Sequence, residues 1–192
     1  MHEVCQHGPA AGGTGAGRGP DRKDEAGPGL DRKDVLMHRN VRAVVEAGKA
    51  LGVDVQAREY PEGTRTAADA ALAIGVDLGQ IVKSLVFCVD GEVVIALVSG
   101  DNRLDEAKLA RAAGGREAWR EDPETVRDAT GFPIGAVPPF GHREPLRMFV
   151  DRDLLEFDEL WAAAGTSSAN FAITPDALVR ATGGTVCDLA VR

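Results

Sequence analysis

The hydrophobic residues of the chain follow two spacings, which predict a mixture of helices and strands. Apolar residues three and four positions apart, beginning with Val41, Val44 and Val45, predict a helix that ends near Gly52. Apolar residues then alternate with polar ones over residues 53–57, a pattern typical of a strand that has one buried face. The ordered part of the chain is therefore expected to begin with a helix followed by a strand.

Two long apolar runs, residues 81–89 and 92–99, are separated only by Asp90-Gly91. Asp-Gly between two apolar runs is a strong signal for a β-hairpin, so these runs are predicted to be antiparallel neighbours. Because most other strands are separated by helices, the sequence predicts an α+β fold with a mixed sheet. Further helices are expected at 66–74, 105–113 and 123–130 and after Thr174-Pro175, and further strands at 146–150, 159–163, 170–173 and 185–190.

The first 34 residues differ from the rest of the chain. They are dominated by Gly, Pro and charged residues, they contain Asp-Arg-Lys-Asp twice, and they show no periodic apolar positions. Such a segment cannot bury enough surface to offset its chain entropy. We therefore expect residues 1–34 to be a disordered tail and residues 35–192 to form one folded domain.

Length, charge and cysteine content narrow the functional classes. The 192 residues are 44% hydrophobic, which is enough for one core, and the longest apolar run is too short to cross a membrane. The net charge of −8 argues against indiscriminate binding of phosphates, so a nucleic-acid partner would have to be engaged locally. Three widely spaced cysteines indicate neither a disulfide framework nor a zinc site. A cytoplasmic protein without a metal is the expectation.

Two segments could carry chemistry. Lys83 stands near the start of the apolar run 81–89, where its ammonium could lie over a pocket, although a lysine there could equally cover apolar surface with its stem. Residues 131–141 form a loop rich in Gly and Pro, in which backbone N–H groups could approach a ligand oxygen. The loop matches neither the dinucleotide fingerprint nor the P-loop, and an ordinary turn is the alternative.

Three other candidates have simpler interpretations. Ser84 has no His or Asp at a spacing that would mark it as a nucleophile, and it is expected to bond to the backbone. His142, alone in its loop, is expected to be solvated. The arginines and lysine between Arg103 and Arg120 alternate with acidic residues, a pattern that predicts a solvated surface of mixed charge.

Several segments taken together resemble a known family, the YbaK/ProX-type aminoacyl-tRNA editing domains. The resemblance covers roughly residue 37 to the C-terminus. It implies a curved mixed sheet of six or seven strands, a partial barrel ringed by helices, with a cleft that holds the 3′ end of a tRNA. The resemblance rests on residues 80–85 (QIVKSL), on Arg103-Leu104-Asp105 with Lys108-Leu109-Ala110, on the 131–141 loop, and on Ala164-Gly165 followed by residues 173–178 (ITPDAL).

The resemblance also assigns roles to individual residues. Lys83 and Gly135 match the family's site lysine and glycine, and Tyr60 matches its site tyrosine. Ser84 and Asn170 complete the expected substrate-binding set. Asn170 departs from the aspartate found in members that act on cysteinyl-tRNA. Because an amide can only hydrogen-bond a substrate ammonium that a carboxylate would pair with, the identity of the amino acid is left open.

The activity implied by the resemblance is hydrolysis of a misacylated aminoacyl-tRNA that carries a small amino acid such as Cys, Ala or Ser. A water or a substrate hydroxyl would attack the ester, with the Gly135 N–H facing the developing oxyanion, and no cofactor is expected. The resemblance implies the aminoacyl-tRNA 3′ end as a partner, with an aminoacyl-tRNA synthetase as a second candidate. A non-catalytic module that binds tRNA or a synthetase, and hydrolysis of another small activated ester, are the alternatives.

Overall fold

The structure is a computed structural model that describes residues 38–61 and 63–192. His38–Arg192 form one compact unit, and the expected tail at residues 1–34 lies outside the described residues. Within the described residues, no helix is long and apolar enough to span a membrane.

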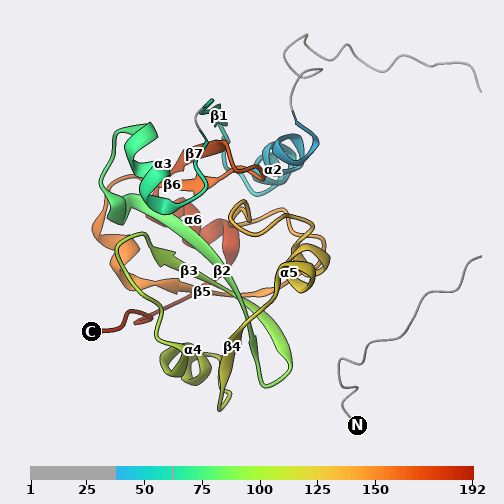
Figure 1. Cartoon of the computed structure of the whole chain (residues 1–192), viewed down its shortest axis with the longest axis vertical. Coiled ribbons are helices and arrows are strands. Elements are labelled where there is room, and N and C mark those ends of the chain that lie inside the picture. The colour runs from blue at the N-terminus through green and yellow to red at the C-terminus, as the bar shows by residue number, and fades with distance from the viewer. Residues whose placement is uncertain (1–37, 62) are drawn as a thin grey trace, which may run out of the picture. The chain divides into compact units, whose positions relative to one another are not determined.

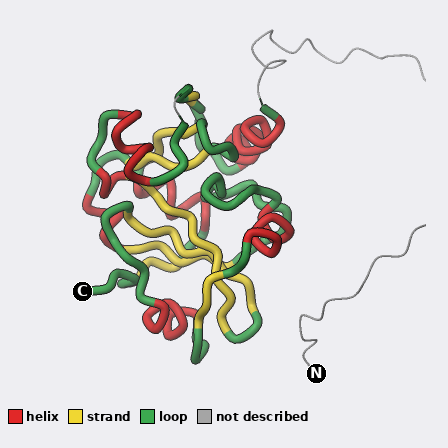
Figure 2. The backbone as a smooth tube through the Cα atoms, viewed as in Figure 1, coloured by secondary structure: helices red, strands yellow, loops and turns green. Residues whose placement is uncertain are grey.

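An eight-stranded sheet forms the centre of the molecule (Figures 1 and 2). Its strands run in the order β1-β7-β6-β2-β3-β5-β8, and β4 pairs with β2 away from this path. The pairs β2–β6, β3–β5 and β5–β8 are parallel and the others are antiparallel, so the predicted α+β fold with a mixed sheet is confirmed. The strands are β1 (Arg58–Glu59), β2 (Ile81–Val89), β3 (Glu92–Ser99), β4 (Ala118–Arg120), β5 (Arg147–Asp151), β6 (Leu160–Ala163), β7 (Ala169–Ile173) and β8 (Thr185–Cys187).

The helices begin and end at residues that the sequence marks clearly. Thr66 and Asp69 form a capping box at the start of α3, and Gly75 ends this helix in the left-handed conformation. Proline at the first turn opens α5 and α6, as the sequence predicts. The helices are α2 (Arg39–Ala50), α3 (Ala67–Ile74), α4 (Glu106–Ala113), α5 (Pro123–Thr130) and α6 (Pro175–Thr182), with short 3-10 turns η1 (Leu78–Gln80) and η2 (Arg152–Glu156).

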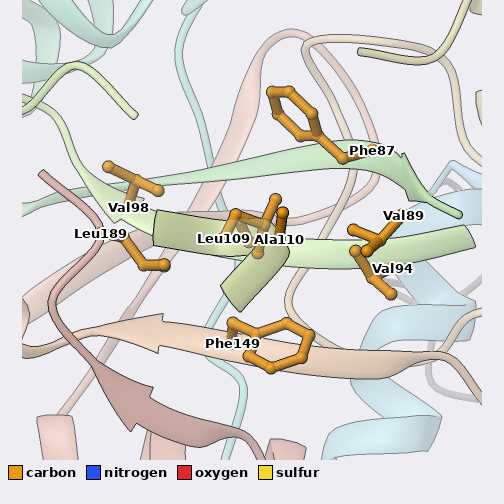
Figure 3. Packing of buried hydrophobic residues seen from close by; sticks show 9 residues of the cluster. Phe87, Val89, Val94, Val98, Leu109, Ala110, Phe149 and Leu189 are labelled. Atoms are coloured by element: carbon orange, nitrogen blue, oxygen red, sulfur yellow. The ribbon is translucent and has the colours of Figure 1, made fainter. Parts of the chain in front are cut away.

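The hairpin of β2 and β3 supplies much of the core. Phe87 and Val89 of β2 and Val94, Ala96 and Val98 of β3 are buried together under α4 (Figure 3). The hairpin turn at Asp90-Gly91 has positive φ at both residues, as the Asp-Gly signal predicts. This hairpin, anchored in the core by its apolar residues, carries Lys83 and Ser84 near the start of β2.

Three strands differ from the sequence prediction. The strand expected at 53–57 is not paired; the chain first joins the sheet at β1, and Val55 packs against Gly48 of α2 instead. The strand expected at 185–190 ends at Cys187, although Ala190 forms a single bridge with Leu104. β4 was not predicted, because three residues in a charged stretch form a strand only through their pairing with β2.

Candidate active site

The edge of β2 opposite β3 is only partly covered by neighbouring strands. β6 pairs with Ile81 and Val82 near the start of β2, and β4 pairs with Phe87–Val89 near its end. In the described part of the chain, residues 83–86 have no strand partner on this edge. The sheet therefore has a gap, four residues long, in the middle of one of its most buried strands.

Ser84 presents polar groups to this gap. The carbonyl of Val86 points to the gap, because it accepts a hydrogen bond of 3.2 Å from the N–H of Glu121. Successive residues in a strand direct their backbone groups to opposite sides, so Ser84, two residues earlier, directs its N–H and C=O to the same gap. Its hydroxyl oxygen is buried and has no hydrogen-bond partner among the described residues. The expectation that this hydroxyl bonds to the backbone was therefore wrong, while the substrate-binding role of Ser84 stays a prediction.

A pocket with a volume of about 190 Å³ lies over the gap. That volume is smaller than the roughly 300–1,000 Å³ of sites for drug-sized ligands, so the pocket suits a small group. It brings together four of the predicted site residues, namely Lys83, Ser84, Gly135 and Asn170. Tyr60 does not line the pocket; it follows β1, and its N–H donates to the carbonyl of Ser168.

Gly135 is exposed and lies in the loop that connects α5 and β5. The N–H of Ala136 donates to the carbonyl of Pro133 at 3.0 Å, which closes a turn with Gly135 at its third position. Gly135 has φ +79°, which that position of a type II turn requires. The 131–141 loop therefore contains an ordinary turn, and Gly135 in that turn also lines the pocket. In the described part of the chain, the N–H of Gly135 has no partner.

The rest of this loop is held firmly. Phe132 and Phe140, before and after Gly135 in the chain, are buried. The Nε2–H of His142 donates to the Pro138 carbonyl oxygen at 2.7 Å, and its ring stands edge-on to Phe132. Burial lowers the pKa of His142, against a smaller opposing effect of the Pro138 hydrogen bond. His142 is therefore a part-buried loop anchor, and the expectation that it is solvated was wrong.

Lys83 extends from β2 toward the turn after β3. Its Nζ donates to the carbonyl oxygens of Gly100, at 2.9 Å, and Asn102, at 2.5 Å. Burial lowers the pKa of this ammonium, while the carboxylates of Asp101 and Asp151 act to raise it. The ammonium is therefore seated in the structure rather than free, and Lys83 contributes to the pocket wall from that seat.

Asn170 is buried in β7 and faces the pocket. Its Nδ2 donates to the hydroxyl of Thr64 at 2.7 Å, and that hydroxyl donates in turn to the carbonyl of Ser167 at 3.1 Å. The Asn170 side chain is thereby fixed by a two-step relay. The sequence analysis did not identify Thr64, which no local motif marks.

Two arginines also lie at the pocket. Arg65 precedes α3 and Arg120 ends β4, and both are exposed. In the described part of the chain neither guanidinium has an ion pair or hydrogen bond, and Glu121 is the nearby carboxylate among the lining residues. Arg120 was expected on a solvated surface of mixed charge, and it is exposed beside Glu121; its pairing with Phe87 through β4 also places it at the pocket.

Comparison with known proteins identifies the family. A sequence profile described as the aminoacyl-tRNA editing domain matches residues 61–181, which include all of the pocket described above. The chain belongs to the aminoacyl-tRNA editing domain family. The resemblance found in the sequence is confirmed, and the open edge of β2 is the place where this member of the family keeps its pocket.

The chain matches a small part of some relatives and most of another. The chain is 36% identical over 123 residues to "Proline--tRNA ligase" of Nitratidesulfovibrio vulgaris (strain DP4), covering 62% of this chain and 21% of the ligase. It is 35% identical over 121 residues to "Uncharacterized protein YwhH" of Bacillus subtilis (strain 168), covering 62% of this chain and 76% of that protein. The chain thus spans about a fifth of the ligase it matches.

A solved structure extends the comparison to the whole fold. The crystal structure of a protein described as a candidate trans-editing enzyme for prolyl tRNA synthetase superposes with a TM-score of 0.77 and 45% sequence identity. The match covers 81% of this chain and 99% of that one. Within the described residues, no group of three or more His, Cys, Asp or Glu side chains could hold a metal ion.

Proposed function

We propose that the protein hydrolyses the ester bond of misacylated aminoacyl-tRNA, acting on the tRNA after its release from a synthetase. The observation that carries this proposal is the small pocket of about 190 Å³ at the open edge of β2, which Ser84 and Gly135 both line and where the buried Ser84 hydroxyl has no partner among the described residues. Membership of the editing domain family supports the reaction class. The likeness to a candidate trans-editing enzyme supports action on free aminoacyl-tRNA.

Ester hydrolysis needs donors aimed at the oxyanion that develops on the carbonyl oxygen. In our proposal the N–H of Gly135 is such a donor. Gly135 has φ +79° in an exposed turn, and its N–H has no partner among the described residues. The nucleophile is a water or the free ribose hydroxyl next to the ester. Ser84 orients the aminoacyl group through its hydroxyl and its backbone N–H and C=O.

The tRNA end is held by charge. Arg65 and Arg120 offer unpaired guanidiniums at the pocket, and guanidinium groups bind phosphate oxygens in a bidentate manner. Because the whole chain has a net charge of −8, these two arginines confine phosphate binding to the pocket. The volume of the pocket supports a small amino acid such as Cys, Ala or Ser, and Asn170 contributes to the choice among them.

The experiment is a deacylation assay with tRNAs charged with Cys, Ala, Ser, Thr or Pro. The measured quantity is the rate at which the labelled aminoacyl group is lost from the tRNA. The wild type should hydrolyse at least one of them, and Lys83→Ala should reduce that rate by at least about tenfold, on the scale of lost transition-state contacts. Lys49→Ala is the matched control, because Lys49 is an exposed lysine at the end of α2.

A wild type that binds these tRNAs without hydrolysing any of them would favour the alternative, a non-catalytic module that binds tRNA. Equal rates for Lys83→Ala and Lys49→Ala on an accepted substrate would refute the role of Lys83. Thermal unfolding of each variant separates loss of activity from loss of fold.

A further inference from the structure

We propose that Asn102 and Asp151 are positioning residues for Lys83, holding the carbonyl seat that fixes its ammonium beside the pocket. This inference rests on the proposed function for its kinetic consequence. Its structural content, a seat built from β3, β5 and the turn between β3 and α4, stands on contacts in the structure.

The seat consists of two backbone carbonyls. Gly100 and Asn102 both accept from the Nζ of Lys83. An ammonium has three donors, so the seat occupies two and leaves one available, on a residue that lines the pocket. A lysine that is held in this way acts as a fixed point charge with a single available proton, whereas a free lysine would sample many rotamers.

The turn that carries these carbonyls is clamped on both sides. A side chain at Gly100 would clash with the carbonyl oxygen of Leu78, so the backbone of this turn packs directly on η1. The hydroxyl of Ser99, one residue earlier, donates to the carbonyl of Gly79 at 2.7 Å. Close packing of this kind fixes the start of the turn, and the side chain of Asn102 fixes its end.

Asn102 is anchored by two carboxylates. Its Nδ2 donates to Asp151 Oδ2 and to Asp153 Oδ2, both at 2.7 Å. Asp153 is in turn bound by Arg192 at 2.8 Å, on the surface of the protein. Asp151, at the end of β5, is fully buried, and its second carboxylate oxygen has no partner among the described residues.

A buried carboxylate without full pairing is costly, so its retention calls for a role. The role of Asp151 is to hold Asn102 by a hydrogen bond and to favour the ammonium of Lys83 by its charge. The charges that act on Lys83 are Asp101 from the same turn and Asp151 from β5, which both favour the ammonium, and Arg120 from β4, which opposes it. On its other side Asp151 faces Cys187 of β8, where its charge adds to the burial that raises the pKa of that thiol.

Together these contacts form a chain from Asp151 through Asn102 to Lys83. Asp151 holds the side chain of Asn102, and the backbone carbonyl of Asn102 holds the ammonium. Removing the charge of Asp151 should both loosen the seat and remove one of two carboxylates that keep the lysine protonated. A residue that only stabilised the fold would do neither.

The test uses the full chain and the variant Asp151→Asn, which keeps the shape of the side chain and removes its charge. Asp188→Asn is the matched control, because Asp188 is a neighbouring carboxylate that pairs with Lys108, Arg152 and Arg192 and contacts neither Asn102 nor Lys83. Asn102→Ala is the second variant, since it removes the anchored side chain and keeps the backbone carbonyl of the seat.

Two measurements are made on each protein. NMR titration of the Lys83 side chain, assigned by its loss in Lys83→Ala, reports its pKa without any need for activity. Deacylation of the best substrate across pH reports kcat and KM separately. Asp151→Asn should lower the pKa of Lys83 below its wild-type value and reduce kcat by about ten- to a hundredfold with little change in KM, the cost of a misplaced catalytic group. Asn102→Ala should reduce kcat in the same way.

An unchanged Lys83 titration in a folded Asp151→Asn protein would overturn the proposal, as would equal effects of Asp151→Asn and Asp188→Asn. If Asp151→Asn does not fold, a wild-type kcat and Lys83 titration in Asn102→Ala would overturn it as well. If the wild type hydrolyses no aminoacyl-tRNA, the proposed function fails, while the titration still decides whether the seat holds Lys83.

Discussion

The side-chain amide of Asn170 donates to the hydroxyl of Thr64 at 2.7 Å, and that hydroxyl donates in turn to the carbonyl of Ser167. A carboxylate in place of Asn170 has no proton to donate. Thr64 would then have to turn its hydroxyl toward the carboxylate and release Ser167. The relay thus explains in physical terms why an amide suits this chain where related cysteinyl-tRNA editors are expected to carry an aspartate.

Asn170→Asp should therefore change both stability and specificity. We expect a loss of about 1–3 kcal/mol in the free energy of unfolding, the cost of a disrupted buried hydrogen bond. The ratio of kcat/KM between cysteinyl and alanyl or seryl substrates should change by more than about fivefold, or roughly 1 kcal/mol. Thr64→Ser keeps the hydroxyl and should leave the ranking in place. An unchanged ranking in Asn170→Asp across the panel would rule out a specificity role.

Gly135→Ala tests the proposed oxyanion donor. A methyl at this position would meet only the backbone oxygen of Arg65, at 3.6 Å, so the protein itself has room for it. The positive φ is strained for alanine, and the turn should shift its N–H away from the ester. We expect the rate to fall by at least about tenfold, toward the roughly 100- to 1,000-fold typical of a lost oxyanion donor.

The matched control for this change is Gly114→Ala at the end of α4. Gly114 has the same φ of +79°, and an added methyl there meets nothing within 4 Å. Both variants therefore carry similar backbone strain, and thermal unfolding should show similar losses. If Gly114→Ala lowers the rate as much as Gly135→Ala does, general strain accounts for the effect and the donor role is wrong.

Arg120→Gln should weaken binding of a tRNA acceptor-stem hairpin that ends in CCA. Removing one phosphate contact is expected to lower the slope of log affinity against log salt by about one. Arg116→Gln removes the same charge four residues earlier, but Arg116 is highly exposed and pairs with Asp90. Fluorescence titration at several salt concentrations should therefore separate the two variants, and equal slopes would show that Arg120 contacts no phosphate.

The stability of the protein should fall as the pH drops below about 6.5, the ordinary pKa of histidine. Burial lowers the pKa of His142, so the unfolded chain takes up its proton at a higher pH than the folded protein does. Protonation therefore favours the unfolded state in this range. Thermal unfolding from pH 8 to 5 should show a smaller decrease in His142→Gln than in the wild type. Parallel curves for the two proteins would contradict this assignment.

Much of the fold could be predicted because its signals are local. The ends of β2 and β3 coincide with the two apolar runs around Asp90-Gly91, and α3 begins at Thr66 and ends before Gly75 as the capping residues indicate. Such signals need only a few neighbouring residues. β4 has no comparable signal, because its three residues become a strand only when β2 provides a partner.

The residues of the candidate site could be predicted only in part, because several of them come together only through the pairing of distant strands. Lys83 and the 131–141 loop were singled out from the residue pattern, the family resemblance assigned roles to Lys83, Ser84, Gly135 and Asn170, and the structure gathers these four residues at one pocket. Their roles stay predictions. Arg120 could not be placed, since its position depends on a strand that the sequence does not reveal. The seat of Lys83 depends on Asn102 and Asp151, which are brought together only by the sheet.

The gap in the edge of β2 limits how far the stability of this domain can rise during evolution. Exposed strand edges invite pairing with other chains, and here the flanking strands leave only four residues uncovered, too few to template an intermolecular sheet. Lengthening β6 by two residues would satisfy the backbone of Ser84 and make the sheet more stable. It would also fill the pocket floor, so a variant selected for heat resistance alone would tend to lose its substrate.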